Sequence, residues 1–116
     1  MRIVHAAPFR RSLDAQLEFL VAREDQDGIL RLREDLAALE TLLASFPDAG
    51  RELARSEDAT LRKLKLRRCP FVVWYVRRSD RVTLARIFHA RQRPVPRQDA
   101  LRGSVLRYKD PTEPVE

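Results

Sequence analysis

Residues 61–94 hold three strand-like runs separated by turn signals, and the first alternates apolar and polar residues with the period of two of a strand with one buried face. Three cations and two leucines alternate at the start of this stretch: Lys63, Leu64, Lys65, Leu66 and Arg67. A nearly continuous β-prone run follows over residues 71–76, and another strand pattern covers residues 82–88 after a polar break of hairpin length. These runs predict a three-stranded antiparallel meander with one basic face.

Two longer stretches place their apolar residues three and four positions apart, which predicts helices over residues 9–25 and 29–46. We expect the chain to turn between them at residues 26–28 (Gln-Asp-Gly). It should leave the second helix at Pro47, because proline cannot continue a helix. The two helices then form an antiparallel hairpin. Their apolar stripes can be buried only by packing on the predicted sheet.

The rest of the chain completes the predicted fold class. Residues 1–6 have a strand pattern, whereas residues 51–60 have little apolar content and predict an irregular connector. The expected class is α+β, with an antiparallel sheet made of the N-terminal strand and the C-terminal meander. The two-helix hairpin is expected to pack on one face of this sheet.

Two parts of unequal size are predicted along the chain. Residues 1–94 form the domain, and residues 95–116 form a C-terminal extension. A weak helical spacing in the extension joins Leu101, Val105 and Tyr108. The residues after position 108 include two prolines and are expected to be disordered.

The charge balance narrows the classes of partner. The chain has 23 basic and 17 acidic residues, a formal net charge of +6, and 34% of its residues are charged. Such a surplus favours nucleic acid, the ribosome or an acidic protein as partner. The alternative is that the arginines are simply solvated. Because the chain has no run of about 20 apolar residues and no apolar leader, we expect a cytoplasmic protein without a membrane span.

Several kinds of chemistry have no signal in the sequence. The two histidines and the one cysteine do not have metal-ligand spacing, and the three glycines do not form a phosphate-binding loop. No cofactor is therefore expected. Cys69 is interpreted as a small residue at a strand end and not as a nucleophile, because no Cys–His pairing is visible.

The basic residues of the meander are the candidate site. They are Lys63, Lys65, Arg67, Arg86, His89, Arg91 and Arg93. Gathered on one surface, such cations would bind phosphates, or stabilise the charge that develops when a 2′-hydroxyl attacks its neighbouring phosphodiester. A histidine would serve as acid or base in that reaction. Two other interpretations stay open: the same residues are the solvated side of the sheet, or they dock an acidic partner.

The order of these elements resembles the RelE/ParE superfamily of bacterial type II toxin–antitoxin toxins over residues 1–94. Five segments carry the resemblance: residues 1–4 (MRIV), 42–50 (LLASFPDAG), 63–67 (KLKLR), 70–76 (PFVVWYV) and 86–91 (RIFHAR). The resemblance implies a small toxin with a helical hairpin on an antiparallel sheet. It also implies a cognate antitoxin that neutralises the toxin in a hetero-oligomer.

Two activities are implied by the superfamily. RelE-like members cleave messenger RNA on the ribosome, and here they would use Lys63, Lys65, His89 and Arg91. ParE-like members poison DNA gyrase without an established nuclease site. In that case Lys63, Lys65, Arg67, Arg86, Arg91 and Arg93 are expected to be binding residues.

The departures from the RelE-like pattern favour the ParE-like activity. Val72 stands where RelE-like enzymes carry an arginine, and no tyrosine follows Arg91 within a few residues. Tyr108 is too distant to take that role. A further nuclease branch pairs a histidine with a tyrosine, and His89 is followed by Ala90 instead. A ribosome-dependent endoribonuclease and a non-toxic remnant that still binds antitoxin stay open as alternatives.

The antitoxin is expected to contribute an amphipathic, largely helical segment. Its apolar side chains would enter a groove between hairpin and sheet, and its carboxylates would contact the arginines.

Overall fold

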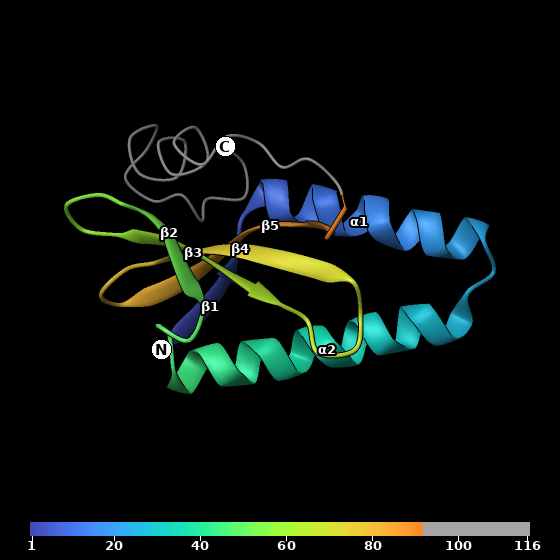
Figure 1. Cartoon of the computed structure of the whole chain (residues 1–116), viewed down its shortest axis with the longest axis horizontal. Coiled ribbons are helices and arrows are strands. Elements are labelled where there is room, and N and C mark those ends of the chain that lie inside the picture. Colours follow the sequence, from blue (N-terminus) through green and yellow to red (C-terminus); the bar gives the residue numbers. More distant parts are fainter. Residues whose placement is uncertain (92–116) are drawn as a thin grey trace.

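A central strand, β4 (Phe71–Arg77), organises the sheet in the computed structural model, which describes residues 1–91. The sheet has five strands in the order β1-β5-β4-β3-β2 (Figure 1). The other elements are β1 (Arg2–His5), α1 (Ala7–Ala22), α2 (Gln26–Ser45), β2 (Arg51–Arg55), β3 (Thr60–Lys65) and β5 (Arg81–His89). The predictions for residues 95–116, and the site residue Arg93, lie outside the described residues.

The predicted meander is confirmed, but the sheet is mixed and not purely antiparallel. Strand β4 pairs antiparallel with both β3 and β5. Strand β1 pairs parallel with β5, with Ile3 opposite Val82. Parallel neighbours need a long connection, and the helical hairpin together with the other strands provides it. The alternation of residues within the first strand cannot reveal the direction of its neighbour.

Strand β2 corrects the prediction of an irregular connector over residues 51–60. It pairs antiparallel with β3, and a tight turn closes the hairpin, in which Ser56 N donates to Ala59 O at 2.9 Å. The pairing register shifts between Glu52 and Ala54. Strand β2 lies at the edge of the sheet, where polar side chains are common because they prevent pairing with other chains. The polar composition of residues 51–55 is that of an edge strand, and for this reason the sequence did not predict β2.

The turn between the helices lies earlier than predicted. The Asp25 side chain accepts a hydrogen bond from Gly28 N at 2.8 Å and caps α2, so residues 26–28 are the first helical turn. At the end of α1, Asp25 N donates to Leu20 O, and Glu24 has the left-handed φ of 56°. This is a Schellman ending in which glycine would be usual. The prediction took Gly28 as the turn, whereas the Asp25 cap decides where α2 begins.

Both helices pack on one face of the sheet, called the inner face here, as predicted. Buried leucines of α2, among them Leu32, Leu39 and Leu43, contact the inner side chains of the sheet. Helix α1 lies along β5 beyond the end of β1, where Ser12 Oγ accepts a hydrogen bond from Ile87 N at 3.0 Å. The hairpin turn of the helices and the β2–β3 and β4–β5 turns lie at opposite ends of the molecule (Figure 1).

A buried carboxylate attaches the β3–β4 turn to α2. Asp35 accepts hydrogen bonds from Arg68 N at 2.7 Å and from Arg68 Nε at 3.1 Å. Burial raises the pKa of Asp35, but the hydrogen bonds from Arg68 and Cys69 outweigh this and hold the pKa below its usual 3.8. Burial and the bond to Asp35 raise the pKa of the Cys69 thiol to about 11. A protonated, buried thiol agrees with the structural interpretation of Cys69.

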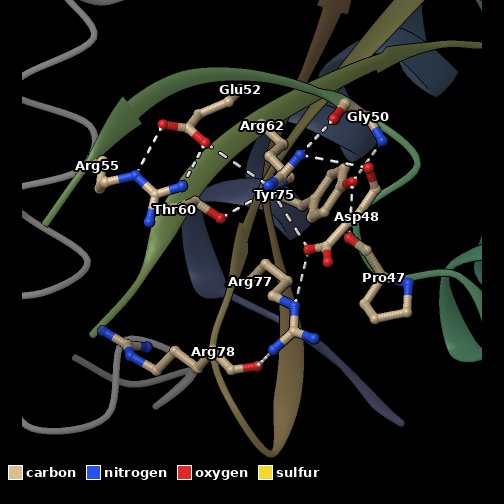
Figure 2. A network of polar contacts seen from close by, with 10 residues as sticks. All are labelled: Pro47, Asp48, Gly50, Glu52, Arg55, Thr60, Arg62, Tyr75, Arg77 and Arg78. Atoms are coloured by element: carbon tan, nitrogen blue, oxygen red, sulfur yellow. Dashed lines mark hydrogen bonds and ion pairs between the residues drawn. The ribbon is translucent and has the colours of Figure 1, made fainter. Parts of the chain in front are cut away.

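The turn after α2 approaches the sheet closely at Gly50. Tyr75 Oη donates to Pro47 O at 3.0 Å and accepts from Gly50 N at 2.8 Å (Figure 2). A Cβ atom on residue 50 would lie 2.6 Å from Lys63 O and 2.7 Å from Tyr75 Oη. Backbone stands on one side and a buried ring on the other, so the site has no room for a larger residue.

We expect Gly50→Ala to lower the free energy of unfolding by about 1 to 3 kcal/mol, the usual cost of overpacking. Denaturant unfolding measures this change. Ala49→Ser in the same turn is the control, because residue 49 is exposed and should change stability by less than about 0.5 kcal/mol. Equal stability of the two variants would show that the turn can move away from the sheet.

Asp35→Asn should lower the free energy of unfolding near neutral pH by about 1.5 to 3 kcal/mol, because it removes hydrogen bonds to a charged acceptor. The folded pKa of Asp35 lies below 3.8, so its contribution is complete above the unfolded pKa. That contribution is lost as the pH falls through the folded pKa. The stability difference from wild type should therefore be constant above about pH 5 and shrink below pH 4.

Glu34→Gln is the matched control for this measurement. Glu34 also binds Arg68, at 2.7 Å, but it is exposed and should contribute less than about 1 kcal/mol. A stability difference for Asp35→Asn that does not change with pH would contradict the assigned role of its charge.

Candidate functional site

Basic side chains gather in two places on the sheet, and one group is paired with carboxylates whereas the other has no such partners within residues 1–91. The paired group lies on the inner side of the sheet, beyond the end of α2 (Figure 2). Arg77 Nε donates to Asp48 Oδ1 at 2.9 Å, and Arg62 lies 3.6 Å from both Asp48 and Glu52. Arg55 binds Glu52 at 2.8 Å. We call these five residues, together with Tyr75, the arginine network.

The arginine network is structural. Arg62 Nη1 also donates to Gly50 O at 2.8 Å and to Asp48 O at 3.2 Å, so it ties the turn after α2 to the sheet. Burial raises the pKa of Tyr75, which keeps its hydroxyl protonated as a donor to the same turn. An open depression of about 310 Å³ adjoins the network, but the network arginines that line it already bind carboxylates.

Sequence reasoning did not identify the arginine network. Its one visible signal was the break after the second helix, where Pro47, Asp48 and Gly50 each contribute a backbone or side-chain contact. Pairing of these residues with Arg62 and Tyr75 depends on strand register, which the sequence alone does not supply.

The second group lies on the opposite, outer face of the sheet. Lys63, Trp74 and Arg86 stand side by side on β3, β4 and β5, and Lys65, Val72 and Phe88 form the next row. We call Lys63, Lys65 and Arg86 the outer basic surface. Within residues 1–91 their side chains make no ion pair or hydrogen bond. These three are the predicted site residues that the structure brings together.

Arg86 is the most unusual cation of this surface. It is half-buried, and its Nε atom is buried without a hydrogen-bond partner. Burial, and next the repulsion of Arg11 on α1, lower the pKa of the Arg86 guanidinium. A carboxylate or a phosphate placed here would relieve both effects. The outer basic surface is therefore suited to binding an anionic group.

The other predicted site residues lie elsewhere. His89 stands opposite Phe71 on the inner side, where the two rings meet edge to face at 5.7 Å. Its Nδ1 atom accepts a hydrogen bond from Arg91 N at 3.1 Å. Arg67 and Arg91 are exposed at the end of the sheet where β3 and β5 finish. The histidine is thus separated from the outer basic surface by the thickness of the sheet.

Apolar side chains are exposed at the tip of the helical hairpin. Phe19 is 55% exposed, Val21 61% and Leu30 55%. We call these three residues the hairpin tip. A shallow groove on the same part of α1 is lined by Leu17, Val21 and neighbouring residues. Exposed apolar groups of this kind mark protein–protein contact sites.

Two other kinds of site find no support in residues 1–91. No three of their histidine, cysteine and acidic residues are arranged to hold a metal ion. None of their helices is long and apolar enough to cross a membrane.

Comparison with known proteins adds the family to this geometry. No curated protein matches the chain. The family model described as "ParE toxin of type II toxin-antitoxin system, parDE" matches residues 3–94, which include every helix and strand of the described structure except the first residue of β1. The chain therefore belongs to the ParE toxin family of type II toxin–antitoxin systems.

Proposed function

We propose that this toxin inhibits growth by binding and poisoning DNA gyrase, in the cytoplasm, and that its cognate antitoxin neutralises it. The family implies an antitoxin partner. We infer the target from the cations on the outer face of the sheet, and from the lack of acid–base side chains beside them within residues 1–91.

The distribution of proton-transferring side chains carries this proposal. On the outer face, Lys63, Lys65 and Arg86 have no histidine or tyrosine of residues 1–91 beside them. His5 contacts Glu40 of α2 at 2.8 Å on the inner side, His89 lies on the inner side, and Tyr75 binds the turn after α2. Cations alone bind and orient an anionic partner, whereas cleavage of RNA also needs placed acids and bases.

A second candidate function rests on one specific observation. Lys63 and Lys65 share a face and have no carboxylate partner within residues 1–91, as in the RelE-like pattern of paired lysines. A RelE-like endoribonuclease would use them on ribosome-bound messenger RNA. Against it, Val72 occupies the position between Lys65 and Phe88 where an arginine would complete the cationic set.

Cells that express the chain without antitoxin separate these functions. Gyrase poisoning should induce an SOS reporter and leave messages intact, and purified gyrase should accumulate cleaved DNA when the toxin is added. Message cuts at codon positions without an SOS response would support the endoribonuclease. Unimpeded growth without either signal would leave the remnant that only binds antitoxin.

The double variant Lys63→Ala, Lys65→Ala tests the same proposal through residues. We expect SOS induction within about threefold of wild type, a change below 1 kcal/mol, because surface cations contribute modestly to a large protein interface. Arg33→Ala is the control, since Arg33 is an exposed cation on α2, away from this surface. Complete loss of toxicity in the double variant alone, with antitoxin binding retained, would favour catalysis.

In place of the groove between hairpin and sheet that the sequence suggested, we propose the hairpin tip as the site for the apolar part of the antitoxin, because Phe19 and Val21 are the most exposed large apolar residues of α1. Phe19→Ser combined with Val21→Ser should weaken antitoxin binding at least tenfold in calorimetry, because two apolar anchors are lost. The same variant should keep the circular dichroism of wild type. Arg33→Ser on the exposed side of α2 is the control. Unchanged affinity in the double variant would move the interface away from the hairpin tip.

A further inference from the structure

We propose that the antitoxin segment on the hairpin tip is a cationic amphipathic helix, whose arginines or lysines pair with Asp14 and Glu18 of α1. This inference rests on the proposed placement of the antitoxin at the hairpin tip, and it adds the charge of the segment that binds there. A chain with a net charge of +6 suggests an acidic partner when its charge is considered as a whole. The local charge of α1 indicates the opposite for this part of the surface.

Two rows of side chains along α1 form the shallow groove near the hairpin tip, which we call the α1 groove. Its lining residues are Asp14, Leu17, Glu18, Val21 and Ala22. Leu17 and Val21 form an apolar row, in which the two residues are four positions apart and lie on neighbouring turns. Asp14 and Glu18 form an acidic row with the same spacing. Rows of this spacing are the ridges against which the side chains of another helix pack, so the α1 groove fits a helical partner.

Both carboxylates of the α1 groove are available to a partner. Asp14 and Glu18 are exposed, and none of the ion pairs within residues 1–91 involves either of them. The carboxylates of α2 behave differently, since Glu34 and Asp35 both bind Arg68. Although the chain has more cations than carboxylates, the described part leaves the carboxylates of α1 without a cation.

The stability of α1 does not explain these charges. Acidic residues stabilise the first turn of a helix and basic residues the last, but α1 has no acidic residue in its first turn and no basic residue in its last. Arg23, which follows the last turn, lies over the ring of Phe19 at 5.2 Å. Asp14 and Glu18 are four positions apart and repel each other weakly. A cation of the antitoxin would remove this repulsion and would also interact with the negative end of the helix dipole.

Arginine and lysine suit both rows of the α1 groove. Their aliphatic stems pack on apolar side chains such as Leu17, and their charged ends reach a neighbouring carboxylate. Val21 lines the α1 groove and also belongs to the hairpin tip, so the two form one continuous surface. One antitoxin helix can therefore cover both, with apolar residues on the hairpin tip and cations three or four positions apart over the acidic row.

The double variant Asp14→Asn, Glu18→Gln removes both charges and keeps the shapes of the side chains. In calorimetry with the full-length cognate antitoxin, we expect it to bind about three- to tenfold more weakly than wild type at about 0.05 M salt, because two exposed ion pairs are lost. At about 0.5 M salt the difference should fall below about twofold, because salt screens exposed charges.

Glu57→Gln combined with Asp58→Asn is the matched control. It makes the same change in net charge in the exposed β2–β3 turn, at the opposite end of the molecule from the hairpin tip (Figure 1). It should bind the antitoxin as wild type does at both salt concentrations. The Asp14→Asn, Glu18→Gln variant should also unfold at a denaturant concentration equal to or above that of wild type, because it removes a repulsion. Weaker binding is then not a result of unfolding.

Unchanged or tighter binding of the Asp14→Asn, Glu18→Gln variant at low salt would overturn the proposal, and so would a loss that is equal at both salt concentrations. If Phe19→Ser with Val21→Ser still weakens binding in those cases, the antitoxin lies on the hairpin tip and only the assigned charge is wrong. If neither double variant changes the affinity, the placement is wrong as well. Self-association of the toxin alone that the Asp14→Asn, Glu18→Gln variant abolishes would assign the α1 groove to a second copy of the chain and overturn the proposal.

Discussion

Strand β4 has large apolar side chains on both of its faces, and the structure depends on burying both. Val73 and Tyr75 point to the helices, whereas Trp74 and Val76 point the other way. The inner side is closed by α1 and α2 where they reach, and by the arginine network where α2 has ended. The inner face is thus covered by apolar packing where the helices lie on it and by ion pairs where they do not. Pro47, just after the end of α2, marks the boundary between these two parts.

Periodicity predicted the type of most elements, because the apolar residues of α1, α2, β4 and β5 each face one or two buried surfaces. Predictions from periodicity were wrong where a helix cap, an edge position or the pairing of distant strands determines the structure. Asp25 caps α2, so the helix already begins at Gln26, within the predicted turn, and β2 needs few apolar residues since it is an edge strand. The parallel pairing of β1 depends on how the chain returns through β5, which lies some 80 residues later.

The site was harder to predict than the fold, because charge in a sequence does not show its partner. Lys63 and Arg62 are neighbours in the chain and both basic, yet they point to opposite faces. Arg62 binds carboxylates and a backbone carbonyl, whereas Lys63 has no such partner in the part of the chain that the structure describes. The register of β3 alone determines that Arg62 has a structural role and that Lys63 can bind a partner. His89 illustrates the same point, since one position along β5 moves it away from the lysines.

The edge position of β2 has a consequence for the toxin when it is not bound to its antitoxin. An open edge offers unpaired backbone groups to any other extended chain, including another copy of itself. Here the edge is only five residues long, it carries Arg51, Glu52 and Arg55, and its register is interrupted after Glu52. Short length, charge and a bulge each oppose strand addition. The exposed border of the sheet is in this way protected against self-polymerisation, so that association is left to surfaces of defined shape.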